Sequence, residues 1–403
     1  MEETRKTSRK GWKIAVVALL LLIAVGVTAV VGLWHNELAT LLSFEMLQPA
    51  DPDHRDGAVY QMEVQGNYYF PEFLEQGGAS NDRELIGFVT QSITKGLIPM
   101  KIETTTIGCA AFTAQTAEGN ALFGRNYDFD PTNTCIVTTH PTDGRHASVS
   151  TVDLQFLGID EERGVEGMMD RINCLAAPYA PLDGVNDAGV ACAILMTMQG
   201  PDGGVVATDQ QTEKPDITST TLLRLILDYA DSVEEAVELA AAYDLHDSTH
   251  TSFHYMVADS TGRSAILEWT AGTDGTDTDG AARTLHVYYN DEDAELGTWE
   301  AESDFQWLTN FVVVPDYYED PAARTGFDRY QSLYEDLSGC GGVVADTDQA
   351  MGFLQTIGRR VWPNSTGVTV HSAVFDLKNC TMHWVANEHY DDPAYCYTFS
   401  AVQ

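Results

Sequence analysis

The stretch GCAAFTAQTAEGNALFGRNYDF, residues 108–129, decides how this chain folds around its chemistry. Residues 110–114 and 121–126 have the composition of two short strands, and the polar Glu118-Gly-Asn120 between them is typical of a hairpin turn. Such a hairpin folds Arg125 and Asp128 back toward Cys109. We therefore expect a reactive cysteine at the start of the first strand, with a cation and a carboxylate beside it.

A cysteine attacks well only as its thiolate, so Cys109 needs a base that takes its proton. No histidine lies in this stretch. The α-amine of Cys109 itself is suitable, because a free α-amine has a pKa of about 7.7–8.0, near working pH. That requires the Gly108–Cys109 bond to break. Gly108 has no side chain, so it permits the strained backbone and the close sulfur approach of an N→S acyl shift.

The stretch resembles the signature of the choloylglycine hydrolase family of N-terminal-nucleophile hydrolases, which includes bile-salt hydrolases, penicillin V acylases and acid ceramidase. The resemblance rests on the cysteine, the hairpin and Gly-Arg-Asn-x-Asp, residues 124–128. It implies that Cys109 is the nucleophile, that Arg125 lies by the sulfur and lowers its pKa, and that Asp128 holds the new α-amine.

Further matches follow in the order that the family has. The segment DGVNDAGV, residues 183–190, resembles a family turn whose Asn186 would help to form an oxyanion hole. LTNF, residues 308–311, resembles a later segment whose Asn310 would supply the other donor. Arg329 is the match for a late active-site arginine, and Arg324 is its neighbouring competitor.

Periodicity and turn signals predict an α+β fold in which hairpins dominate. Helices are expected over residues 81–95, 220–230, 233–243, 328–337 and 347–357, with Ser232 and Glu235 as a capping box. A buried strand is expected over 190–196, and hairpins over 253–258 with 264–269 and over 368–375 with 381–385. The resemblance implies a four-layer αββα sandwich of two antiparallel sheets.

The N-terminal end predicts a membrane anchor. Residues 14–33 carry no charge and are long enough to span a bilayer, with Trp12 and Trp34 at the two ends. Five bases precede them, which predicts a cytoplasmic N-terminus and an extracellular catalytic domain. A cleaved signal peptide is the alternative. The expected division is a cytoplasmic tail 1–13, an anchor 14–34, a linker 35–57, a pro-segment 58–108 and a catalytic domain 109–403.

The chain is strongly acidic, with 22 Lys+Arg against 60 Asp+Glu and a net charge of −38. Such a surface repels nucleic acid, so we expect a small-molecule partner and no nucleic acid. A homo-oligomer stays possible.

We expect no cofactor and no metal. His250 and His254 have a spacing that suggests metal ligands, but the acidic loop 274–279 lacks the EF-hand pattern. His371 is expected to be a core or rim residue.

The resemblance predicts a hydrolase of linear amide C–N bonds that cuts itself before Cys109. Its substrates would be N-acyl compounds with an apolar acyl part, such as conjugated bile salts, penicillins, N-acyl amino acids or lipid amides. Acyl transfer at the same site is one alternative, and an inactive binding protein of the same fold is another. A papain-type peptidase is disfavoured, because a hairpin and not a helix follows the cysteine.

The chain has seven cysteines. Three of them lie in turn-like segments where disulfide bridges are possible: Cys340, Cys380 and Cys396.

Overall fold

The computed structural model describes residues 2–100, 108–160, 162–200, 204–271, 282–292, 295–296, 299–300, 304–315, 317–318, 320–359 and 367–402. The loop expected over residues 272–282, with its acidic part 274–279, lies almost wholly outside this described part.

The larger sheet has nine strands in the order β1-β2-β5-β6-β7-β8-β11-β12-β13. Its neighbours are antiparallel except for β2 and β5, which run parallel. The strands are β1 (Glu45–Gln48), β2 (Val59–Gln65), β5 (Thr134–His140), β6 (Ser148–Asp153), β7 (Asp183–Asn186), β8 (Ala191–Met196), β11 (Phe253–Ala258), β12 (Ser264–Thr270) and β13 (Thr284–Tyr289).

The second sheet has seven strands and contains the hairpin that opened the sequence analysis. Its order is β16-β3-β4-β18-β19-β20, and β17 pairs parallel with β3. The strands are β16 (Trp307–Leu308), β3 (Gly108–Thr116), β4 (Ala121–Phe129), β17 (Val343–Val344), β18 (Val368–Asp376), β19 (Thr381–Ala386) and β20 (Cys396–Ser400). Every residue of β4 and β18 is buried, because both faces of these strands are covered.

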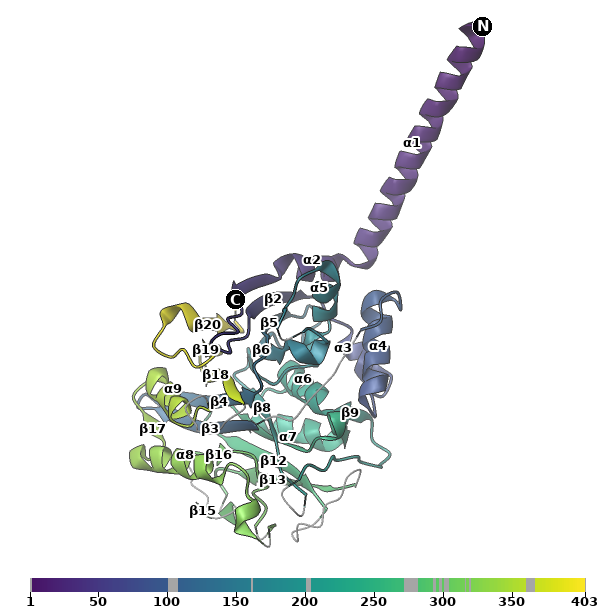
Figure 1. The fold of residues 1–403 in the computed structure, drawn as a ribbon. Coiled ribbons are helices and arrows are strands. Elements are labelled where there is room, and N and C mark those ends of the chain that lie inside the picture. Colours follow the sequence, from purple (N-terminus) through teal and green to yellow (C-terminus); the bar gives the residue numbers. More distant parts are fainter. Residues whose placement is uncertain are drawn as a thin grey trace.

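The two sheets are stacked between two layers of helices (Figure 1). Strands β3, β19 and β20 of the smaller sheet face β8, β7 and β6 of the larger one. Helices α6 (Ser219–Tyr229) and α7 (Val233–Ala242) cover the larger sheet, and α8 (Phe327–Cys340) and α9 (Thr347–Thr356) cover the smaller one. The α+β sandwich of two mainly antiparallel sheets is therefore confirmed, with the apolar core between the layers.

Local signals in the sequence explain where these elements begin. Helix α4 (Asp82–Thr94) starts after Asn81, whose side chain accepts a hydrogen bond from the Glu84 backbone N–H. Ser232 caps α7 in the same way through the N–H of Glu235. The shorter elements are α3 (Phe70–Glu75), α5 (Met168–Cys174), a parallel pair of β9 (Asp216–Thr218) with β10 (Asp244–His246), and β14 (Glu295–Leu296) with β15 (Trp299–Glu300).

The N-terminal part differs from one expectation. Helix α1 (Glu2–Leu33) contains one segment, Trp12–Leu33, that is long and apolar enough to cross a membrane. The segment 35–57, expected as a linker, instead forms α2 (His35–Ser43) and β1. It is ordered because α2 packs on β2, and because β1 pairs with β2 and extends the larger sheet. Its polar composition concealed this edge strand.

The seven cysteines are all free, so the bridges considered for Cys340, Cys380 and Cys396 do not form. The Cys380 thiol contacts the carbonyls of Asp187 and Leu377, and Cys396 stays exposed on β20.

Candidate active site

The β3–β4 hairpin brings the predicted cysteine, arginine and aspartate together at one end of the smaller sheet. In its register Gly108 lies opposite Asp128, Cys109 opposite Tyr127, and Ala111 opposite Arg125. Gly124 is required inside β4 for a steric reason, because a Cβ at this position would lie 2.2 Å from the Phe112 ring. The hairpin therefore positions the site as the sequence predicted.

Cys109 is completely buried in the chain as it stands, with its bond to Gly108 intact. Burial raises the pKa of its thiol, because a low-dielectric interior disfavours the thiolate. The Arg125 guanidinium opposes this shift through its positive charge and a hydrogen bond to the sulfur. The thiol thus has a cation in contact but no neutral base such as histidine bound to it among the described residues.

Arg125 is held in place from the facing sheet. Its Nη2 donates to the Ile194 carbonyl at 2.9 Å, and its Nε lies 3.3 Å from Asp183 Oδ2. His371 Nε2 lies 2.8 Å from the same carboxylate oxygen, and its ring packs between Tyr127 and Trp384. All three of these side chains are buried, so the row His371–Asp183–Arg125 fixes the guanidinium against Cys109.

Asn310 lies beside the backbone nitrogen of Cys109. The Cys109 N–H donates to Asn310 Oδ1 at 3.1 Å, and Asn310 Nδ2 donates to the Met196 carbonyl at 2.7 Å. The oxygen of this side chain, and not its NH₂ group, therefore faces Cys109. Asn310 thus lies beside Cys109, but in this arrangement it holds the amide nitrogen of the Gly108–Cys109 bond and does not offer an oxyanion donor.

A buried histidine–glutamate pair fixes the segment that carries Asn310. His254 contacts Glu268 Oε1 through Nδ1 and the Thr309 carbonyl through Nε2, both at 2.8 Å. The Glu268 carboxylate also accepts the backbone N–H groups of Val313 and Val314. Both ring nitrogens of His254 are thereby occupied by protein partners.

Arg329, at the start of α8, connects the two halves of the site. Its Nη1 donates to Asp128 Oδ2 at 2.5 Å and its Nη2 donates to Asn310 Oδ1. The other Asp128 oxygen accepts from Thr369 Oγ1 at 2.6 Å. The competitor Arg324 instead lies over the Phe311 and Phe327 rings. The structure thus favours Arg329 over Arg324 as the arginine of the site.

Asn186 is not part of this cluster, which corrects the role expected for it. Its Nδ2 donates to the carbonyls of Leu227 and Ala230 at the end of α6, at 3.3 and 2.8 Å. Its Oδ1 accepts the N–H groups of Ala188 and Val190. The side chain therefore closes its own turn and caps a helix, so neither of its N–H bonds is available to an oxyanion.

Three residues at the site were missed by sequence reasoning. His371 was interpreted as an interior residue, and Asp183 only as the start of a turn. Arg359 completes the set, because its guanidinium fills the space where a Cβ of Gly108 would lie, and its Nε is 3.7 Å from Asp128 Oδ2. The signal available for His371 and Asp183 was that each is a polar residue within a predicted strand or turn of the core.

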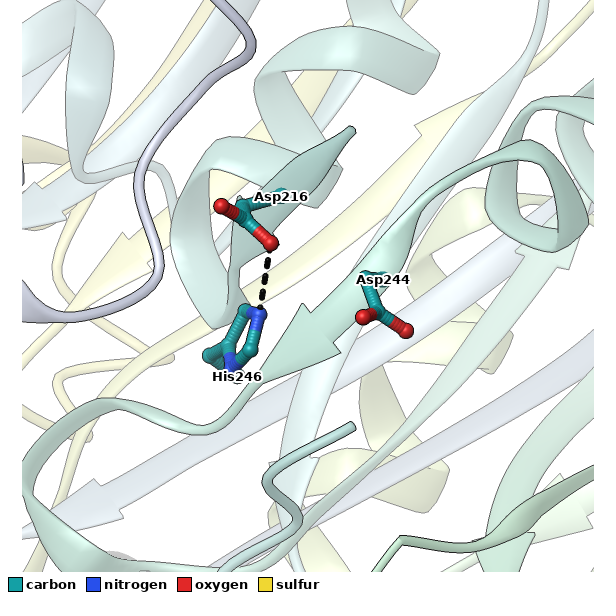
Figure 2. A group of neighbouring side chains, drawn as sticks. All are labelled: Asp216, Asp244 and His246. Atoms are coloured by element: carbon teal, nitrogen blue, oxygen red, sulfur yellow. Dashed lines mark hydrogen bonds and ion pairs between the residues drawn. The ribbon is translucent and has the colours of Figure 1, made fainter. Parts of the chain in front are cut away.

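A different group of side chains has the composition of a cation site. Figure 2 shows Asp216, Asp244 and His246 on the β9–β10 pair, where their ligand atoms lie within 4.8 Å of one another. His246 Nδ1 and Nε2 contact Asp209 and Asp216 at 2.6 and 3.0 Å. Asp244 accepts from the backbone and hydroxyl of Thr212. The group therefore already has protein partners, and its contacts connect β9 and β10 to the segment around Asp209 and Thr212.

The chain is similar to a known family of hydrolases. The family model of the linear amide C–N hydrolases, choloylglycine hydrolase family, matches residues 109–275. The resemblance to this family is confirmed. The match begins at Cys109 and includes Arg125, Asp128 and Asp183, whereas Asn310 and Arg329 lie beyond it. It supports a linear amide C–N hydrolase.

Similar solved structures include a variant of the conjugated bile acid hydrolase from Clostridium perfringens, at 16% identity with a TM-score of 0.45 over 72% of this chain and 92% of that one. Penicillin V acylase from Agrobacterium tumefaciens is 13% identical, with a TM-score of 0.42 over 69% and 83%. An N-acylethanolamine-hydrolyzing acid amidase ortholog from Caenorhabditis elegans is 15% identical, with a TM-score of 0.38 over 67% and 93%. None of the curated proteins matches the chain.

Proposed function

We propose that this chain is a membrane-anchored cysteine amidohydrolase that cuts its own Gly108–Cys109 bond and then cleaves linear amides with Cys109 at the new N-terminus. One observation carries the proposal: the sulfur, the backbone nitrogen and the preceding glycine of one cysteine each have a polar partner, and the partners of the sulfur and the nitrogen are buried. Arg125 contacts the sulfur, Asn310 accepts from the nitrogen, and Arg359 lies against Gly108.

The self-cleavage step follows from these contacts. The Cys109 sulfur loses its proton and attacks the Gly108 carbonyl, so that the C–S bond forms and the C–N bond breaks. The proton passes to the departing nitrogen, which becomes the α-amine of Cys109. Water then hydrolyses the thioester, which leaves a carboxylate on Gly108 and a free thiol. Arg125 stabilises the thiolate that attacks, and Asn310 holds the amide nitrogen that leaves.

The same groups would then serve substrate turnover. The free α-amine takes the proton of the Cys109 thiol, and the thiolate attacks the substrate carbonyl. The proton passes on to the leaving amine as the C–N bond breaks, and water hydrolyses the acyl thioester. Asn310 Oδ1 already accepts from this nitrogen, and Arg329 bonds both to Asn310 and to Asp128, which we expect to hold the α-amine.

Two features fit a requirement for the cut. Cys109 is wholly buried while the chain is intact, so an external amide reaches the sulfur only after the atoms that cover it move. The pro-segment 58–108 contributes β2, an interior strand that pairs with both β1 and β5. We therefore expect the two pieces to stay associated after cleavage, with the anchor on the smaller one.

The proposed substrates are N-acyl compounds with an apolar acyl part, which include conjugated bile salts, penicillins, N-acyl amino acids and lipid amides. The anchor would place the enzyme where such amphiphiles collect, with its N-terminus in the cytoplasm and its catalytic domain outside. Acyl transfer to a nucleophile other than water is the second candidate, since it uses the same thioester. An inactive binding protein would keep the fold but stay uncut.

The test is intact-mass analysis and N-terminal sequencing of the purified full chain beside a Cys109→Ala variant. We expect the wild type to yield a fragment that begins at Cys109 and the variant to stay whole. An Asn186→Ala variant is the matched control, because Asn186 contacts none of the reacting atoms and its loss should leave the cut in place. A wild-type chain that stays whole across neutral and acidic pH would contradict the proposal.

A further inference from the structure

Helix α1 emerges from one end of the domain, beside α2 and α5 (Figure 1), and several elements near this end carry exposed apolar side chains. Beyond α1, the five that define this face, called the apolar rim below, are Leu42, Met46, Leu97, Met168 and Met169. They come from α2, β1, the turn after α4 and the start of α5. Leu42 is 87% exposed and Leu97 is 74% exposed, although the domain has ample apolar core elsewhere. Large apolar side chains left exposed near one end of a domain are candidates for an interaction surface.

An apolar groove of about 180 Å³ lies between the end of α1 and the rim residue Leu97. Its walls come from four helices and the turn after α4, and they include Val30, Trp34, Leu41, Ile93, Leu97 and Ile172. The last turn of the apolar helix and the domain therefore form one continuous apolar surface. Whatever surrounds the end of α1 also reaches the groove and the rim.

The foot of α1 is fixed to the domain and is not a loose tether. Trp34, which follows α1 directly, donates its indole N–H to the Ile93 carbonyl of α4 at 2.8 Å. The apolar window within Trp12–Leu33 has no buried share, so protein covers none of it. A fully exposed apolar helix of this length requires lipid around it. Lipid at α1 is thus the one occupant that also explains the rim.

We propose that the apolar rim rests in the lipid surface that α1 crosses, so that the domain is held against the membrane in one orientation. The inference rests on the proposed membrane anchor and not on the proposed chemistry. Two cations at this face fit lipid headgroups within an otherwise acidic domain. Lys95 lies over the Tyr69 ring and Arg171 over the Phe44 ring, and in the sequence these cations are close to the rim residues Leu97 and Met169.

The experiment uses the full chain with Cys109→Ala, so that every molecule is uncut, in vesicles of phosphatidylcholine and phosphatidylglycerol. A photoreactive diazirine amino acid replaces Leu97 or Met169, and lipid adducts are counted by mass spectrometry after illumination. Leu22, within α1, is the positive control. Val343 is the matched negative control, because it is an exposed apolar residue on β17, away from α1 in Figure 1.

We expect adduct yields at Leu97 and Met169 at least about five-fold above the yield at Val343. Adding Leu42→Asp to the Met169 probe should lower its yield, because a carboxylate at the rim resists insertion into lipid. Adducts at Leu22 without adducts at Leu97 and Met169 would overturn the docking proposal and leave the anchor standing. No adducts even at Leu22 would overturn both, while the self-cleavage test above would be unaffected.

Discussion

Replacing Arg329 with methionine tests whether the site is held together by one buried ion pair. The Arg329 and Asp128 side chains are 1% and 0% exposed, and Arg329 Nη1 lies 2.5 Å from Asp128 Oδ2. At an effective dielectric of about 20, two unit charges about 4 Å apart interact by about 4 kcal/mol. Removing one partner also leaves a buried carboxylate with less compensation, which typically costs about 3–5 kcal/mol. We expect Arg329→Met to lower the free energy of unfolding by about this amount.

The assay is a double-mutant cycle in the Cys109→Ala background, with Arg329→Met, Asp128→Asn and the double variant. Urea unfolding followed by tryptophan fluorescence gives each free energy. Because the double variant leaves neither Arg329 nor Asp128 as a buried charge without the other, it should cost less than the two single changes together, with a coupling of at least about 2 kcal/mol. Arg263 and Glu234 form a partly exposed pair and serve as the control cycle, with an expected coupling below about 1 kcal/mol. A coupling at Arg329–Asp128 no larger than that control would refute the reasoning.

Three further predictions concern residues around the site and the core. Gly124→Ala should lower the free energy of unfolding by about 1–3 kcal/mol, because its Cβ meets the buried Phe112 ring; an unchanged urea midpoint would contradict this. Asn186→Ala should cost about 1–3 kcal/mol through the lost turn and helix-cap bonds, yet still yield the fragment that begins at Cys109; a folded variant that stays whole beside a wild type that is cut would return Asn186 to the site. Burial raises the pKa of Asp247 to about 6, so its contribution to stability is full below its unfolded pKa and is lost as pH rises through about 6, by up to about 3 kcal/mol. Asp247→Asn should flatten the fall in thermal midpoint between about pH 4 and 7, and an unaltered fall would exclude this carboxylate as its source.

Sequence reasoning succeeded where short-range geometry decides the structure. The β3–β4 hairpin needs only a turn and two strands, so the approach of Arg125 and Asp128 to Cys109 followed from register alone. Helix starts at Asn81 and Ser232 were equally local, because each cap bonds to a backbone N–H three residues later. Segment 35–57 was misjudged because an edge strand owes its order to the strand beside it, here β2, and not to its own composition.

Long-range pairing explains what the sequence left open at the site. Arg329 and Asp128 are 201 residues apart, as are Cys109 and Asn310, so no local periodicity links them. His371 and Asp183 meet only because two sheets stack face to face, and that stacking brings the Arg125 guanidinium under restraint from the opposite layer.

The two asparagines show most clearly why a motif alone does not assign a catalytic role. Asn186 lies in a tight turn, and such a turn needs an acceptor for its own N–H groups, which the side chain supplies. Because the amide of Asn186 is fully used in these local hydrogen bonds, it is not available to a functional site. Asn310 lies in a segment whose shape is fixed from outside, by the buried His254–Glu268 pair, so its amide stays available to a distant partner. The Cys109 nitrogen is that partner. A polar residue is thus a better candidate for function when other residues satisfy the backbone around it.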